Sequence, residues 1–169
     1  MSESQRYRLV TRSDFDGLVC AVLLKQRGII DEISFVHPKD MQDGKVAIGP
    51  RDITTNLPYV PGCHLAFDHH ASEIIRLGAE RPANLIIDAG AASAAGVVYR
   101  HFGGEESFPT SAPAMMAAVD KADSAQFSRD EILNPEGWVL LNYLMDARTG
   151  LGRFREFRVS NYHLMMELL

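Results

Sequence analysis

Residues 7–28, YRLVTRSDFDGLVCAVLLKQRG, decide the fold because the period of their apolar residues changes part-way along. Residues 6–12 alternate between apolar and polar side chains, which predicts a β-strand. Between Asp16 and Arg27 the apolar residues return at helical spacing, and Gly28 supplies a C-terminal stop. We therefore expect a strand followed almost at once by a helix, with acidic residues at the junction.

The same alternation of strands and helices continues along the chain. Further strands are expected at 32–36, 45–49, 64–68 and 84–87, and helices at 92–102, 113–121, within 131–147 and at 155–169. Strands separated by helices indicate a parallel sheet with right-handed crossovers. The predicted fold class is α/β: a parallel β-sheet of about five strands with flanking helices and a helical C-terminal part.

The composition is that of a soluble globular protein. Hydrophobic residues make up 46% of the 169 residues and charged residues 23%. The longest apolar run, Leu18 to Leu24, is too short to cross a bilayer, so no membrane partner is expected. Two cysteines, Cys20 and Cys63, form no disulfide framework, which favours a reducing cytoplasm.

The charge balance bears on the kind of substrate. The net charge is −5 and the pI is about 5.6, whereas proteins that bind long nucleic acid usually present a basic face. Arg153, Arg155 and Arg158 cluster late in the chain, and their helical spacing favours a solvated face over a nucleic-acid track. A small phosphorylated substrate fits this balance better than a long polynucleotide.

Acidic residues and histidines gather after the expected strands. Asp14 and Asp16 follow the first strand, Asp52 follows the third, and the triplet 68–70 (Asp-His-His) closes the fourth. In an open parallel sheet, ligands bind outside the carboxyl ends of the strands. We therefore expect these side chains to share one edge of the sheet.

Each of these residues also has a structural interpretation when it is taken singly. Asp14 or Asp16 suits a helix N-cap, Asp52 suits an Asx turn, and a lone histidine after a strand is commonly structural. Together, however, they place several like charges side by side, which is costly unless a cation compensates. Oxygen ligands with one imidazole suit Mn²⁺ or Mg²⁺ better than a thiolate-rich zinc site.

An ordered set of motifs resembles the DHH phosphoesterases, a family of phosphate-ester hydrolases that includes RecJ-like and exopolyphosphatase-like members. The triplet 68–70 matches the signature of that family, and residues 11–17 (TRSDFDG) resemble its first motif. Asp52 matches the isolated aspartate of its second motif. For the fourth motif there are two candidates, and Asp123, followed by Ser124 and Phe127, matches better than Asp120.

The resemblance implies a two-metal site. Asp52 would bridge both ions and Asp14 would bind the first, while the second would be completed by Asp16, His69 and Asp123. Asp68 would orient the site, and His70 would contact the scissile phosphate. Two such ions can share a hydroxide nucleophile and neutralise charge on the phosphoryl oxygens.

Arg12 departs from the resemblance, because the family usually has a metal-ligating histidine at this position. A guanidinium stays charged and cannot bind a metal. Either the first site is weak or empty, or Arg12 supplies the missing positive charge and pairs with substrate phosphate or a nearby carboxylate. The number of ions, one or two, stays open, as does their identity as Mn²⁺ or Mg²⁺.

The resemblance predicts a metal-dependent phosphohydrolase that uses activated water. Residues 1–150 would form the catalytic metal-binding domain, and 151–169 a helix that leads to a C-terminal substrate-binding domain. Two rivals stay open: a phosphatase of the haloacid-dehalogenase kind with Asp14 as its nucleophile, and a non-catalytic metal- or nucleotide-binding regulatory module. The exact substrate is not decided by the sequence, and a homodimer remains open.

Overall fold

The computed structural model describes residues 6–108, 112–146 and 159–169, and it confirms the predicted α/β class. The strands are β1 (Tyr7–Arg12), β2 (Ile30–Val36), β3 (Asp52–Thr55), β4 (Leu65–Asp68) and β5 (Leu85–Ile87). The helices are α1 (Phe15–Gln26), α2 (Pro38–Gln42), α3 (Ala71–Leu77), α4 (Ala94–His101), the short 3-10 helix η1 (Gly104–Glu106), α5 (Ala112–Asp123), α6 (Arg129–Leu133), α7 (Gly137–Met145) and α8 (Asn161–Leu168).

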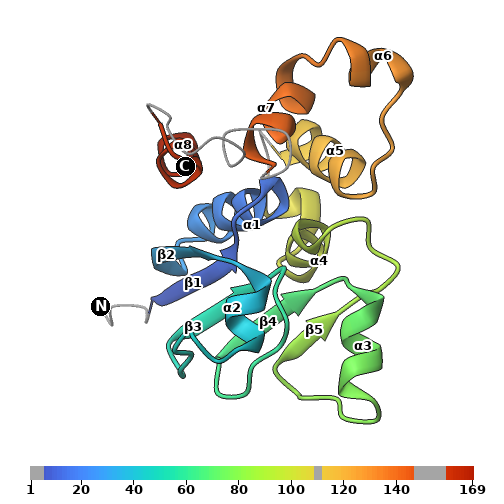
Figure 1. Cartoon of the computed structure of the whole chain (residues 1–169). Coiled ribbons are helices and arrows are strands. Elements are labelled where there is room, and N and C mark those ends of the chain that lie inside the picture. Colours follow the sequence, from blue (N-terminus) through green and yellow to red (C-terminus); the bar gives the residue numbers. More distant parts are fainter. Residues whose placement is uncertain (1–5, 109–111, 147–158) are drawn as a thin grey trace.

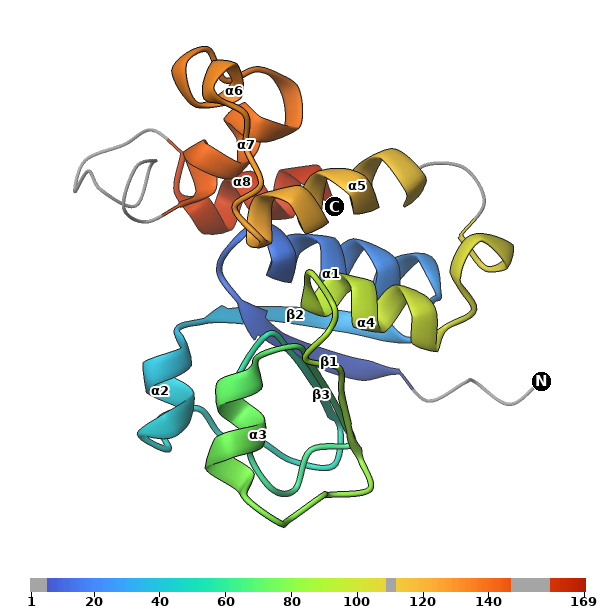
Figure 2. The same ribbon diagram turned by 90° about the vertical axis from the view of Figure 1, so that its right-hand side faces the viewer.

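The five strands form one parallel sheet in the order β2-β1-β3-β4-β5. Helices α1 and α4 lie on one side of this sheet, and α2 and α3 lie on the other (Figures 1 and 2). Beyond α1, the helices α5 to α8 form an outer layer (Figure 1). The chain leaves β1 for β2 on one side and later returns to place β3 on the other, so the strand order reverses at β1. Such a reversal is where parallel α/β sheets usually bind ligands.

The core lies between the sheet and α1. Leu9 from β1, Ile53 from β3 and Phe67 from β4 are buried to within 1% of full burial, as are Leu23 and Leu24 from α1. Burying a side chain of this kind contributes about 1.5–3 kcal/mol relative to leaving it exposed. The central strands and α1 therefore form the rigid support from which the adjoining loops project.

One predicted strand is wrong. Residues 45–49 form no strand, and the third strand is instead residues 52–55. The segment 45–49 contains three apolar residues in a row, but it ends in Gly49 and is followed by Pro50. In contrast, Ile53-Thr54-Thr55 is a β-branched run that suits the pleated sheet. As a result, Asp52 begins a strand rather than following one.

Three of the α-helices in the described part of the chain were not predicted, and one was predicted too long. The region 131–147 was expected to contain one helix, and the structure has two there, α6 and α7. Helix α2 begins at a proline and is capped by the side chain of His37, and α3 follows the triplet 68–70. The predicted helix 155–169 is observed as residues 161–168. Its segment 155–158, and with it the arginine cluster of Arg153, Arg155 and Arg158, lies outside the described residues.

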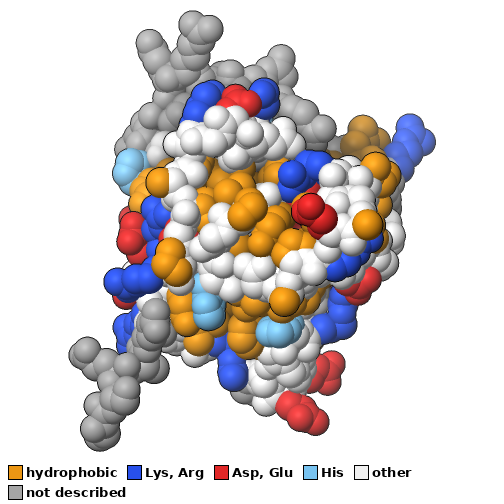
Figure 3. Space-filling model, turned by 90° about the horizontal axis from the view of Figure 1, so that it is seen from below, with side chains coloured by type: hydrophobic (Ala, Val, Ile, Leu, Met, Phe, Trp, Pro, Cys, Tyr) orange, Lys and Arg blue, Asp and Glu red, His pale blue; other side chains and the backbone are white. Residues whose placement is uncertain are grey.

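Two surface features bear on partners. None of the helices in the described part of the chain has the length and apolar character that a bilayer crossing requires. On the face shown in Figure 3, the Lys and Arg side chains lie around the edge of an apolar centre and do not gather into a track.

The turn between β1 and α1 depends on Gly17. Asp14 caps the helix by accepting a hydrogen bond from the backbone N–H of Gly17 at 2.9 Å. A Cβ atom at position 17 would lie 1.9 Å from the carbonyl oxygen of Arg12, a backbone atom that cannot move without shifting β1. Glycine is therefore required here by close approach, not by an unusual backbone angle.

Gly17→Ala should destabilise the fold by about 2–4 kcal/mol, because the added methyl group displaces the strand end. Gly49→Ala is the matched control, since a Cβ there meets nothing within 4 Å. Thermal unfolding followed by circular dichroism measures both variants. Equal melting temperatures for the two variants would show that the turn tolerates a side chain.

Candidate metal centre

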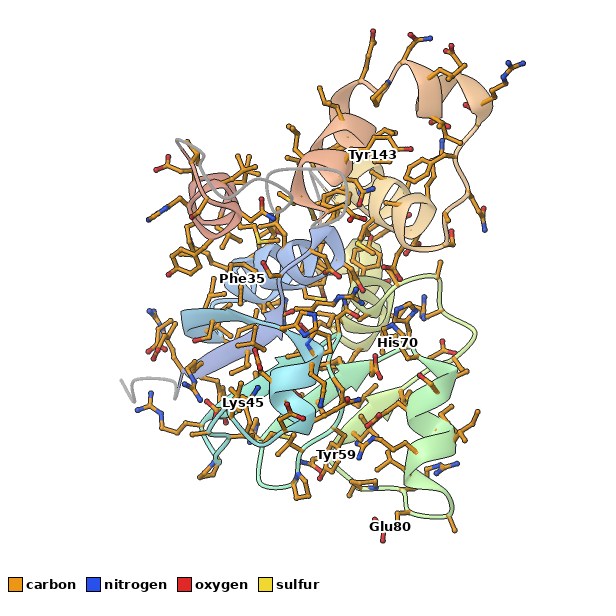
Figure 4. All side chains as sticks on the ribbon, viewed as in Figure 1. Phe35, Lys45, Tyr59, His70, Glu80 and Tyr143 are labelled. Atoms are coloured by element: carbon orange, nitrogen blue, oxygen red, sulfur yellow. The ribbon has the colours of Figure 1, made fainter. Side chains whose placement is uncertain are left out.

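A cavity of about 990 Å³ lies at the carboxyl edge of the sheet. Phe35 of β2, His70 at the end of β4 and Tyr143 of α7 all line it, so its walls come from three separate parts of the fold (Figure 4). Most of the polar residues predicted for the site also line it: Arg12, Asp14, Asp16, His69, His70 and Asp123. The cavity therefore collects residues that are far apart in the sequence.

Three of the predicted ligands converge within this cavity. Asp16, His69 and Asp123 each offer one ligand atom, and these atoms lie within 4.8 Å of one another. The Nε2 atom of His69 lies 3.0 Å from Asp123 Oδ2 and 3.9 Å from Asp16 Oδ2. Two carboxylates with one imidazole form a donor set that suits Mn²⁺ or Mg²⁺.

The ring of His69 is oriented for coordination. Its Nδ1 lies 3.2 Å from the carbonyl oxygen of Ala91, which can only accept, so Nδ1 carries the proton. In its neutral form the ring then presents a lone pair at Nε2, which is buried and faces Asp123 Oδ2 at 3.0 Å. A backbone carbonyl that orients the second nitrogen is the usual support of a metal-binding histidine. The residues present therefore fit a divalent cation.

Asp16 is a buried carboxylate, 2% exposed, at the centre of this group. Its two oxygens accept hydrogen bonds from the backbone N–H groups of Ala94 and Ala95, at 2.9 and 2.8 Å, in the first turn of α4. Burial, followed by the negative charges of Asp123 and Asp14, raises the pKa of Asp16 to about 7. A cation beside Asp16 would offset this cost of ionisation.

The negative charges around Asp16 also change the pKa of His69. Burial lowers the pKa of its imidazole, but contact with Asp123 and the charge of Asp16 raise that pKa by more. The net effect raises the pKa of His69 to about 9. Negative potential in the group thus favours a positive charge, which either a proton or a metal ion can supply.

Asp14 lies beside the group but has other partners. Arg12 Nε lies 2.8 Å from its Oδ2, and Asn56 Nδ2 donates to its Oδ1 at 3.1 Å. Burial raises the pKa of Asp14, and the guanidinium of Arg12 opposes that shift. The structure thus places Arg12 against a nearby carboxylate, one of the positions expected for it.

Of the other two residues of the triplet 68–70, His70 lines the cavity and Asp68 lies behind it. Asp68 is buried, and its Oδ1 lies 2.8 Å from Nδ1 of His70, whose ring is 40% exposed. Hydrogen bonding to Asp68 is the main cause that raises the pKa of His70. Asp68 therefore orients His70 and favours its protonated form.

Asp52 is not part of the site, which corrects the sequence interpretation. It lies at the amino end of β3, where it accepts hydrogen bonds from Arg8 at 2.8 and 2.9 Å and from the Gly49 backbone at 2.7 Å. Burial raises the pKa of Asp52, but the bonds from Arg8 and Gly49 lower it by more. Asp52 is the first residue of β3, so the whole length of that strand lies between it and the carboxyl edge of the sheet. Asp52 therefore cannot bridge ions held at that edge.

Asn56, which the sequence analysis missed, holds the place expected of Asp52. It directly follows β3, adopts a positive φ of 54°, and reaches Asp14. The signal for it was the β-branched run 53–55, which moves the strand end from 49 to 55. Asparagine tolerates this backbone conformation better than most residues.

The two candidates at the end of α5 are separated by the structure. Asp123 faces His69, whereas Asp120 accepts a hydrogen bond from Ser93, the residue that caps α4. Asp123 is thus the one brought to the metal group, and Asp120 has a structural contact.

Comparisons with known proteins bear on the activity of this site. A solved structure described as the pGpG-specific phosphodiesterase PggH from Vibrio cholerae matches with a TM-score of 0.85 and 62% sequence identity. The chain is similar to a phosphodiesterase. The match covers 96% of this chain and 51% of the other, so the chain spans about half the length of that structure. No protein-family model and no curated protein matches the chain.

These findings correct the resemblance to the DHH phosphoesterases. No model of that family matches the chain, and the similar structure is described by its action on pGpG. The exopolyphosphatase-like interpretation likewise finds no support. The metal group stands on its geometry alone, independently of any family.

Changing Asp52 or Asp123 to asparagine should have different effects on stability and on metal binding. Asp52→Asn should lower stability by about 1–3 kcal/mol, since it weakens the pairing with Arg8, but leave Mn²⁺ affinity unchanged. Asp123→Asn should weaken Mn²⁺ binding by at least about tenfold with little change in stability. Isothermal titration calorimetry and thermal unfolding measure the two effects. Loss of Mn²⁺ binding in Asp52→Asn would contradict the placement of the site.

Proposed function

We propose that the chain forms the metal-binding part of a phosphodiesterase that hydrolyses a short linear dinucleotide such as pGpG, with Mn²⁺ or Mg²⁺ as its cofactor. The observation that carries this proposal is the 62% identity, over 96% of the chain, to a pGpG-specific phosphodiesterase. The convergence of Asp16, His69 and Asp123 in one cavity supports it. A small phosphorylated substrate also agrees with the acidic charge of the chain.

Asp16, His69 and Asp123 would hold the cation. A divalent ion there would lower the pKa of a bound water and offset negative charge on the phosphoryl oxygens. The protein fixes the geometry: the N-terminus of α4 holds Asp16, and the carbonyl of Ala91 holds the ring of His69. Both supports are backbone groups, so they do not depend on mobile side chains.

Arg12 and His70 would bind the scissile phosphate. Both line the cavity, and both are about 40% exposed, so their outer atoms can reach a ligand. His70 is held by Asp68 with a raised pKa, which favours an imidazolium that donates a hydrogen bond to a phosphate oxygen. Arg12 retains N–H groups that Asp14 does not use and can place them on the same phosphate.

Hydrolysis of pGpG tests this proposal. The chain is incubated with pGpG, a cyclic dinucleotide or polyphosphate, in Mn²⁺, Mg²⁺ or EDTA, and the products are separated by ion-exchange chromatography. We expect pGpG and one water to give two GMP in the presence of metal, and no reaction in EDTA. Asp123→Asn should lower the rate by on the order of 100-fold. Asp130→Asn, in the exposed helix α6, is the matched control and should keep the rate.

The rival is a module that binds metal or nucleotide without reacting. It predicts that Mn²⁺ and pGpG both bind while no GMP forms under any condition. That result would contradict the proposed hydrolysis. Metal-dependent release of phosphate from polyphosphate, with no action on pGpG, would contradict the proposed substrate class instead.

A further inference from the structure

Three of the roughly four acceptor sites of the Asp14 carboxylate are already used inside the protein. Its Oδ1 accepts from the Gly17 backbone at 2.9 Å and from Asn56 at 3.1 Å, and its Oδ2 lies 2.8 Å from Arg12. A carboxylate oxygen that binds a metal must direct a free lone pair at it. Asp14 has three donors arranged around it and is therefore poorly placed to take a cation as well.

Asn56 occupies the strand end where a second ion would need a bridging carboxylate. Its side chain is neutral and 2% exposed, and its amide nitrogen points at Asp14. The amide oxygen of Asn56 is buried without a hydrogen-bond partner, but it is a neutral ligand atom and brings no negative charge to a second ion. The other aspartate of this strand, Asp52, is committed to Arg8 at the far edge of the sheet.

The charges of Asp14, Asp16 and Asp123 are balanced by one divalent cation together with one guanidinium. Asp40 and Asp146 also line the cavity, and Asp40 is paired with Lys45. Asp14, Asp16 and Asp123 carry three negative charges, while Asp68 is paired with His70. A dication held at Asp16, His69 and Asp123 offsets two of the three, and Arg12 against Asp14 offsets the third. A second dication would add positive charge beside a permanent one, which is unfavourable at this short range.

We propose that this site binds a single divalent cation, and that Arg12, fixed against Asp14, provides the positive charge that a second cation would otherwise supply. Arg12 is thereby a phosphate-facing group held at a set position. This inference rests on the proposed function, because it assumes the cation at Asp16, His69 and Asp123.

The test is the number of Mn²⁺ ions bound per chain, measured by isothermal titration calorimetry and by electron paramagnetic resonance. The unmodified chain should bind one Mn²⁺ and give the six-line spectrum of an isolated ion. The double variant Arg12→Ala, Asn56→Asp removes the fixed charge and supplies a bridging carboxylate. It should bind two ions and show the broadened spectrum of a coupled pair. Arg51→Ala with Gln26→Glu makes the same change of charge at exposed positions and should still bind one.

The number of Mn²⁺ ions bound per chain tests the single cation separately from the proposed phosphodiesterase activity. Two ions in the unmodified chain would overturn the inference while leaving a metal-dependent phosphodiesterase intact. No bound ion would overturn the proposed metal and the inference together. A folded double variant, checked by circular dichroism, that still binds one ion would show that Arg12 and Asn56 do not limit the number. The count in the unmodified chain decides the main point even if the double variant does not fold.

Discussion

The burial of Asp16 among other negative charges is the constraint on which the rest of the site depends. An ionised carboxylate that is 2% exposed, with Asp14 and Asp123 nearby, needs compensation. Two backbone N–H groups at the start of α4 supply part of it. The lone pair of His69 faces the same space and adds no positive charge while Nε2 is unprotonated. A cation between these groups would complete the compensation, which is why we interpret the group as a metal site.

The fold meets this constraint through its topology. The strand order reverses at β1, so the turn after β1 and the residue after β3 lie together at the carboxyl edge. Gly17 lets α1 start so close to the strand that Asp14 and Asp16 both reach the cavity. Asp16 faces α4 and the metal group, whereas Asp14 faces Arg12 and Asn56. Two carboxylates separated by one residue thereby have different surroundings and different roles.

Local patterns predicted the elements well, and long-range pairing explains what they missed. The change of period at 7–28 indicated β1 and α1, and the triplet 68–70 was correctly placed at the end of β4. Segments 45–49 and 52–55 are both short and partly apolar, and only the pairing of Ile53 with Leu9 in the sheet makes the second one the strand. That choice moved Asp52 out of the site and put Asn56 into it. The contact of Asn56 with Asp14 spans 42 residues, so neither residue's neighbours in the sequence indicate it.

The central claim is that Asp16, His69 and Asp123 hold a cation. The most direct measurement is anomalous X-ray diffraction from crystals of the chain grown or soaked with Mn²⁺, with data collected on both sides of the manganese absorption edge. The account predicts one anomalous peak within coordination distance of His69 Nε2 and of an oxygen from each of the two aspartates. A peak coordinated by other residues, or no peak at a Mn²⁺ concentration that saturates binding in solution, would contradict it.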